Sequence, residues 1–141
     1  MTELQAALGV SQMQRLDEFV AKRHILQKRY GSLLDNLPII KPYQDNHSYS
    51  ALHLYPIQIE LDKVSNNREQ IFNELRESGI GVNVHYIPIH TQPYYLNLGF
   101  KEKSFPNAEY YYSRAISIPL YHSMTIEQQN KVVVVLSNAI N

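Results

Sequence analysis

Residues 79–88 have the sequence Gly79-Ile80-Gly81-Val82-Asn83-Val84-His85-Tyr86-Ile87-Pro88, in which a helical pattern gives way to an extended one. Apolar residues spaced as on one helix face precede this stretch, and Gly79 is typical of the residue that ends a helix. From position 82 to position 86 apolar and polar residues alternate, which predicts a strand, and Pro88 ends it. The stretch therefore predicts a helix that passes through a short turn directly into a strand.

The first part of the chain carries apolar side chains at spacings of three and four, from Leu4 to Leu34. This spacing predicts one amphipathic helix of about 30 residues with a kink at Gly9. The helix should end before Pro38, because proline disfavours helical geometry in the preceding residue. Helices of globular domains usually run about 8–20 residues, and longer ones often link two bodies. The alternative is a long surface helix on a single domain.

The rest of the chain alternates short strands with helices. A strand is predicted over residues 52–61, where the phase of the apolar residues changes at Pro56, as it does at a β-bulge. Helices are predicted from Asn66-Asn67, where an asparagine cap precedes an early acid, from Phe105, and from Thr125, which begins a capping-box pattern. A short strand is predicted over residues 116–120, between the last two helices. This order predicts an α+β fold, with a mainly antiparallel sheet and helices on one side of it.

The composition excludes several classes of protein. The 141 residues amount to one domain of roughly 100–200 residues, and 13 basic residues balance 13 acidic ones, so the formal net charge is zero. A nucleic-acid-binding protein typically shows a basic excess. No cysteine is present, which excludes a disulfide framework, a cysteine-ligated metal and a cysteine nucleophile. No apolar run approaches the roughly 20 residues of a membrane helix, so neither nucleic acid nor a membrane is an expected partner.

Candidate binding residues gather between positions 79 and 101, a stretch that contains no aspartate or glutamate. They include Asn83, His85, Tyr86 and His90, which offer neutral hydrogen-bonding groups, an aromatic ring and two imidazoles. Such a surface suits a sugar, a nucleotide or a phosphate, since no carboxylate repels the ligand. The alternative is that the tyrosines pack in the core and the histidines face solvent. A metal site is not expected, because the two histidines are five residues apart with no acid nearby.

Several segments occur together in a fixed order, namely Met1–Gly9, His53–Ile57, Gly79–Tyr94, Phe105–Glu109 and Ile118–Tyr121. In sequence and spacing they resemble the C-terminal part of the DegT/DnrJ/StrS family, whose members are pyridoxal phosphate (PLP)-dependent aminotransferases acting on nucleotide sugars. The resemblance covers essentially the whole chain. Within the family, the sequence resembles most the branch that makes 4-amino-4,6-dideoxy sugars for surface glycans, such as the pseudaminic-acid pathway transaminases.

The resemblance implies a domain organisation. Family members are fold-type I homodimers, in which a large domain holds PLP on a lysine and a small C-terminal domain closes over the site. By this resemblance, residues 1–35 form the inter-domain helix, residues 36–141 form the small C-terminal domain, and the large PLP-binding domain is absent. The family's Schiff-base lysine lies upstream of these segments. No catalytic residue, cofactor-binding residue or bound PLP is therefore expected in this chain, which should be inactive alone.

The resemblance also implies a function. The full-length enzyme is expected to be cytoplasmic and to transfer an amino group from glutamate to a 4-keto-6-deoxy nucleotide sugar for surface polysaccharide biosynthesis, with PLP as cofactor. This chain would contribute the substrate-binding residues Asn83, Val84, His85, Tyr86 and His90. Hydrogen bonds from His85 and Tyr86 to the sugar or diphosphate are expected. Two alternatives stay open: a stand-alone module that binds sugar nucleotides without catalysis, and a dimerisation or regulatory domain.

Overall fold

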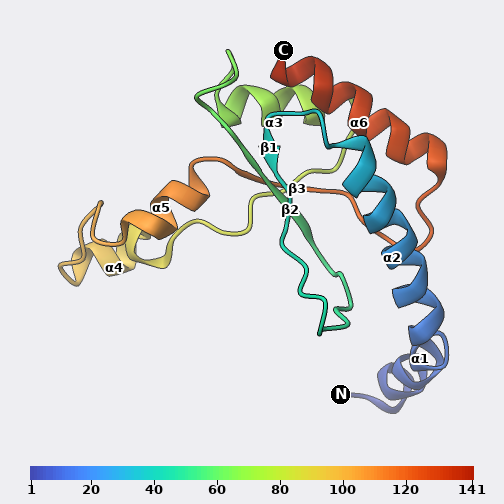
Figure 1. The fold of residues 1–141 in the computed structure, drawn as a ribbon. Helices are drawn as coiled ribbons and strands as arrows, with labels where there is room; N and C mark the ends of the chain where they lie inside the picture. Colours follow the sequence, from blue (N-terminus) through green and yellow to red (C-terminus); the bar gives the residue numbers. More distant parts are fainter.

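A computed structural model describes residues 1–141 as six α-helices, one 3-10 helix and three β-strands (Figure 1). In chain order the elements are α1 (Glu3–Met13), α2 (Leu16–Leu33), β1 (Ile39–Ile40), β2 (Tyr55–Ile59), α3 (Arg68–Glu77), η1 (Ile89–Thr91), α4 (Pro93–Asn97), α5 (Pro106–Tyr112), β3 (Ala115–Ile118) and α6 (Ile126–Ile140). Helices and strands are intermixed along the chain, which confirms the predicted α+β class.

The three strands form one antiparallel sheet in the order β1-β2-β3. β2 pairs with β3 along most of its length, whereas β1 pairs only with the last two residues of β2. On the other side of β3, Asn83 forms an isolated bridge to Ser117. All four residues of β3 are buried, so this strand lies at the centre of the fold. The predicted antiparallel pairing is confirmed.

Three helices enclose the core together with the sheet. Figure 1 shows α3 and α6 side by side above the sheet and α2 beside α6, while α4 and α5 stand apart in an arm on the left. The strand β2 buries its first, third and fifth residues, so one of its faces is fully covered. The largest fully buried side chains are those of Tyr30, Tyr55, Leu34, Ile57, Ile59, Ile71, Leu75, Ile116, Leu136 and Gln129.

The helix predicted over residues 1–35 is two helices, α1 and α2, which meet at Gln14 and Arg15. The kink expected at Gly9 is wrong, because Gly9 lies inside α1. A glycine keeps its backbone N–H, and a helix tolerates a single one. The break falls where Arg15 leaves helical geometry, with φ −109° and ψ 7°. Three residues of α2 are buried and none of α1, so only α2 has packing that fixes its direction.

The change of apolar phase at Pro56 is not the predicted bulge. The strand β2 begins at Tyr55 and alternates regularly, whereas Leu52 lies outside it in the left-handed region, at φ 50°. Leu52 therefore does not share the strand's phase. On the β3 side, the Ile59 N–H donates to the Arg114 carbonyl at 2.9 Å. By alternation the missing N–H of Pro56 faces the other side, which β1 does not reach, so the proline removes no ladder hydrogen bond.

The strand predicted over residues 82–86 is reduced to the single bridge at Asn83. The Asn83 Oδ1 accepts a hydrogen bond from the Val84 N–H at 2.8 Å. Both backbone groups of Asn83 bond to Ser117, so by alternation the Val84 N–H points away from β3, and the Asn83 side chain satisfies a donor at the free edge of the segment. The following residues form η1 and α4, and Pro93 occupies the first turn of α4.

The predicted helix ends of α3 and α6 are confirmed. Asn67 caps α3 and Thr125 caps α6, each in a complete capping box with the glutamine three residues on. Gly79 follows α3 with φ 76°, the left-handed conformation that favours glycine at a helix end. Residues 132–135, four consecutive valines, lie within α6, as the capping pattern predicted.

Stability should fall at alkaline pH, because two buried tyrosines resist ionisation. Burial raises the pKa of Tyr55 to about 12, and burial also raises the pKa of Tyr30. An unfolded tyrosine ionises near pH 10. The contribution is therefore complete below about pH 10 and is lost as the pH rises towards 12, by up to about 1.4 kcal/mol per pH unit for each group. Urea unfolding at a series of pH values measures this slope.

The control for this pH dependence is a comparison of the same substitution at a buried and at an exposed tyrosine. Tyr55→Phe should show a shallower fall in unfolding free energy above about pH 10 than the unchanged chain. The exposed Tyr43, replaced by phenylalanine, should keep the original slope. Equal slopes in all three proteins would contradict a role for the buried hydroxyl.

Candidate functional site

The segment from Asn83 to Tyr86 lies along the outer edge of β3. Asn83 and Ser117 exchange two backbone hydrogen bonds, with the Asn83 N–H donating at 3.2 Å and the Ser117 N–H donating at 2.8 Å. Val84 is half-buried and its N–H is held by the Asn83 side chain. The backbone of the segment is thus fixed at one point to the most buried strand, while its side chains reach the surface.

His85 and Tyr86 form a pair at this edge. The His85 Nδ1 lies 2.8 Å from the Ser117 Oγ, and Ser117 is itself only 6% exposed. The peptide bond between His85 and Tyr86 is cis, and their rings meet edge to face with centroids 4.7 Å apart. Tyr86 is 71% exposed. The pair presents the His85 Nε2 and the Tyr86 hydroxyl, two groups that can donate or accept hydrogen bonds.

His90 belongs to a different environment. Its side chain is 6% exposed, and its Nε2 lies 2.8 Å from the Glu109 Oε1 at the start of α5. The same carboxylate accepts the Lys103 N–H at 2.6 Å, and the Phe105 ring packs against the imidazole with centroids 4.8 Å apart. The hydrogen bond from His90 lowers the pKa of Glu109. His90 therefore ties η1 to α5 and does not share the exposed surface of His85 and Tyr86.

Two residues of this region were missed from the sequence. Ser117 supports His85, and Glu109 pairs with His90. Ser117 could have been noticed as a lone polar residue between Ile116 and Ile118 in an apolar strand. Glu109 had no comparable signal, because it lies 19 residues from its partner and an acid in the first turn of a helix is ordinary.

Metal and membrane signatures are lacking in the structure. No group of three histidine, cysteine, aspartate or glutamate side chains lies close enough together to hold a metal ion. None of the helices combines the length and the apolar character that crossing a membrane requires.

The DegT/DnrJ/EryC1/StrS aminotransferase family matches residues 1–137 of the chain. The chain belongs to this family. A DegT-family relative, the spore coat polysaccharide biosynthesis protein SpsC of Bacillus subtilis, is 39% identical over 136 residues, which are 94% of this chain and 35% of SpsC. The chain spans about a third of the length of the curated relatives it matches.

Solved structures of aminotransferases share this fold. Spr1654 of Streptococcus pneumoniae, in its PLP form, superposes with a TM-score of 0.89 and 28% identity over 99% of this chain and 36% of Spr1654. Helicobacter pylori PseC, an aminotransferase of pseudaminic acid biosynthesis, has a TM-score of 0.89 and 25% identity over 99% of this chain and 38% of PseC. The chain therefore has the fold of part of a sugar aminotransferase, as its sequence predicted.

The side chains of this DegT-family member do not form a PLP site by themselves. PLP is held by a lysine, with a charged partner beside its pyridine nitrogen. None of the seven lysines is buried, and Lys22, Lys41 and Lys63 pair with surface acids. Lys131 lines a pocket, but no carboxylate lines it.

Proposed function

We propose that this chain is the small domain of a PLP-dependent aminotransferase that moves an amino group from glutamate to a 4-keto-6-deoxy nucleotide sugar for surface glycan synthesis. The observation that carries the proposal is the pair of half-buried His85 and exposed Tyr86, which His85 anchors to β3, in a DegT-family chain. The names of SpsC and PseC, for polysaccharide and pseudaminic acid biosynthesis, support a nucleotide sugar as substrate. PLP and its lysine would lie on a second domain, within a cytoplasmic homodimer.

The surface area of the chain supports a larger assembly. The chain exposes 9513 Å², whereas a compact monomer of 16.4 kDa exposes about 7,500 Å². The excess, about 2,000 Å², is more than the roughly 800 Å² that one partner buries in an interface of standard size. Helix α1 buries no residue and exposes Leu4 and Leu8. In the proposed enzyme, α1 and the start of α2 would pack against the PLP-binding domain.

Substrate recognition would use the edge of β3. The His85 Nε2 and the Tyr86 hydroxyl would hydrogen-bond sugar hydroxyls or diphosphate oxygens, with the exposed Asn83 amide and the Val84 backbone beside them. Residues 79–101 contain no carboxylate to repel a diphosphate. His90 would act indirectly, because its hydrogen bond to Glu109 holds the segment that follows Tyr86 in place.

Incubation with PLP tests directly whether the cofactor is held by another domain and not by this chain. The 141-residue chain should form no stoichiometric PLP–lysine adduct that borohydride can trap, because none of its lysines is buried and no carboxylate is buried that could pair with the pyridine nitrogen. Intact mass spectrometry after reduction, with PLP equimolar to protein, measures the adduct. A single fully modified lysine would contradict the proposal that the cofactor is held by another domain.

Titration with a UDP-sugar separates this proposal from a stand-alone binding module. The isolated chain should bind weakly or not at all, since the proposed pocket is shared with a second domain. Calorimetric binding at one site per chain, abolished by His85→Ala, would instead favour a module that binds sugar nucleotides without catalysis.

A further inference from the structure

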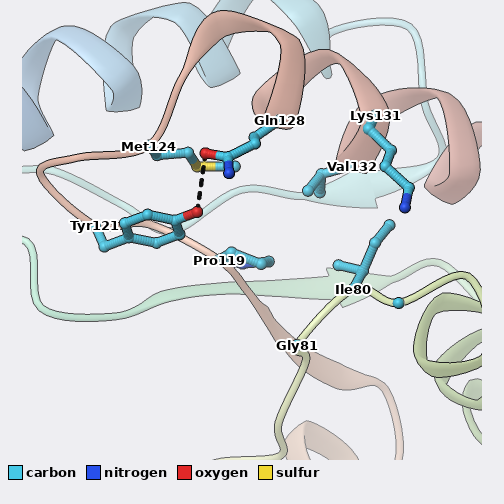
Figure 2. A pocket seen from close by; sticks show the side chains of 9 residues that line it. Ile80, Gly81, Pro119, Tyr121, Met124, Gln128, Lys131 and Val132 are labelled. Atoms are coloured by element: carbon cyan, nitrogen blue, oxygen red, sulfur yellow. Dashed lines mark hydrogen bonds between the residues drawn. The ribbon is translucent and has the colours of Figure 1, made fainter.

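The pocket that Lys131 lines has a volume of about 450 Å³ and lies between the turn that follows α3, the link from β3 to α6, and α6 itself (Figure 2). None of its lining residues belongs to the proposed substrate surface at residues 83–86 or to the environment of His90. No aspartate or glutamate lines it. The pocket therefore needs an explanation of its own.

Two side chains of α6 bring nitrogen donors to this pocket. Gln128 and Lys131 are three residues apart, which places them on the same face of the helix. The Gln128 Oε1 is already engaged, because it accepts the Thr125 N–H at 2.9 Å and the Tyr121 hydroxyl at 3.0 Å. Its amide NH₂ is consequently left without a protein partner. Figure 2 shows the Tyr121–Gln128 bond at one end of the pocket and Lys131 at the other.

The ammonium of Lys131 has no carboxylate partner within 4.0 Å, unlike that of Lys22, Lys41 or Lys63. It lies 3.8 Å from the position that a Cβ on Gly79 would occupy, so it stands over the turn. In the same turn, the Gly81 N–H donates to no acceptor in the protein. An ammonium, an amide NH₂ and a backbone N–H therefore line one pocket without partners, and all three are donors that an anion satisfies.

The rest of the pocket is apolar. Its wall consists of Ile80, Pro119, Met124 and Val132, and Ile80, Met124 and Val132 are nearly fully buried. The ring of Tyr121 closes one side. A concave apolar surface with a few polar groups at its rim is the usual form of a small-molecule site.

We propose that this pocket binds a small organic carboxylate whose apolar or aromatic body rests on Ile80, Met124 and Val132. The one full positive charge, that of Lys131, matches the single charge of a carboxylate. The proposed carboxylate binding does not depend on the proposed aminotransferase activity. The alternative is a structural role, in which Lys131 is attracted to the carbonyl end of α3; its Nζ lies 3.8 Å from the Cβ position of Gly79 there. That alternative predicts no benzoate binding.

The experiment is an NMR titration of the 141-residue chain with benzoate. Saturable shifts are expected for the Gly81 amide, the Gln128 side-chain amide and the Ile80 and Val132 methyl groups, but not with benzyl alcohol, which lacks the charge. Lys131→Gln should weaken benzoate binding by about tenfold or more, since a charged hydrogen bond is lost. Lys131→Arg should retain it. Lys28→Gln, which removes the same charge from an exposed site on α2, should leave it unchanged.

Three results would overturn the proposal. The first is an absence of saturable shifts at Gly81, and the second is equal benzoate affinity in Lys131→Gln and Lys28→Gln. The third is inorganic phosphate binding as tightly as benzoate, because the apolar wall would then contribute nothing. Ligand-free spectra of Lys131→Gln keep the test specific. If the Ile80 and Val132 methyl shifts match those of the unchanged chain, the loss of binding is due to the missing ammonium. If they are displaced, the loss is due to a changed fold, and the proposal is refuted.

Discussion

Replacing Tyr30 by alanine is expected to lower the free energy of unfolding by about 3–5 kcal/mol, the range for removing a large aromatic side chain from a core. Tyr30 is fully buried on α2, and its ring packs against Tyr55 of β2 with centroids 5.1 Å apart. Its hydroxyl donates to the Pro119 carbonyl at 3.0 Å. One side chain thus joins α2 to β2 and to the link between β3 and α6.

The large loss of unfolding free energy is expected because few other buried residues hold α2 in place. A domain of this size is stable by only about 5–15 kcal/mol, and α2 buries just two other residues, Val20 and Leu26. The cavity left by the ring cannot be filled from α1, which makes no buried contact. Urea unfolding followed by far-ultraviolet circular dichroism measures the change in free energy.

Two variants show whether the ring or the hydroxyl is responsible. Tyr30→Phe keeps the ring and should lose only about 0.5–1.5 kcal/mol, the net value of one hydrogen bond. Tyr43→Ala removes the same side chain from a position that is 86% exposed, where the change should stay within about 0.5 kcal/mol. If Tyr30→Ala unfolded at the same urea concentration as Tyr43→Ala, the assignment of α2 to the core would be wrong.

The parts of the fold that could be predicted from the sequence depend on local chemistry. Asn67 and Thr125 cap their helices through a residue three positions away, and Gly79 adopts a conformation that other residues avoid. Such signals are complete within one turn of the chain. They correctly favoured a helix over residues 132–135 against the strand preference of valine.

The parts that could not be predicted depend on distant contacts. The break between α1 and α2 follows from packing that α2 has and α1 lacks. The segment after Val82 alternates like a strand, but only one bridge, between Asn83 and Ser117, forms. Apolar alternation alone carries no information about either event.

In the candidate site, too, local sequence features could be predicted but distant contacts could not. His85, Tyr86 and His90 are close in sequence and chemically alike, so the sequence grouped them in one surface. The structure separates them, since Ser117 of β3 holds His85 while Glu109 of α5 draws His90 into the arm. The partners that make this difference lie 32 and 19 residues away, and only the tertiary fold brings them near.

The largest functional effect is expected from the pair of His85 and Tyr86. In a full-length enzyme that contains this domain, His85→Ala and Tyr86→Ala should each lower kcat/KM for the nucleotide sugar by about 10-fold to 100-fold. This is the value of a hydrogen bond to a charged group such as a diphosphate. The amino-donor half-reaction should be much less affected, because the proposed contacts are to the sugar nucleotide. Steady-state kinetics with each substrate varied in turn separates the two effects.

Ser117 gives this prediction its internal control. Ser117→Ala leaves both side chains of the pair in place but removes the hydroxyl that orients His85 through Nδ1. As a positioning residue it should raise KM for the nucleotide sugar by a smaller factor than His85→Ala, with little change in kcat. His53→Ala and Tyr43→Ala remove an exposed histidine and an exposed tyrosine elsewhere, and both should behave like the unchanged enzyme. If His85→Ala and Tyr86→Ala matched these controls in KM and in turnover, the edge of β3 would not be the substrate surface, and the tyrosine and histidine there would be ordinary surface residues.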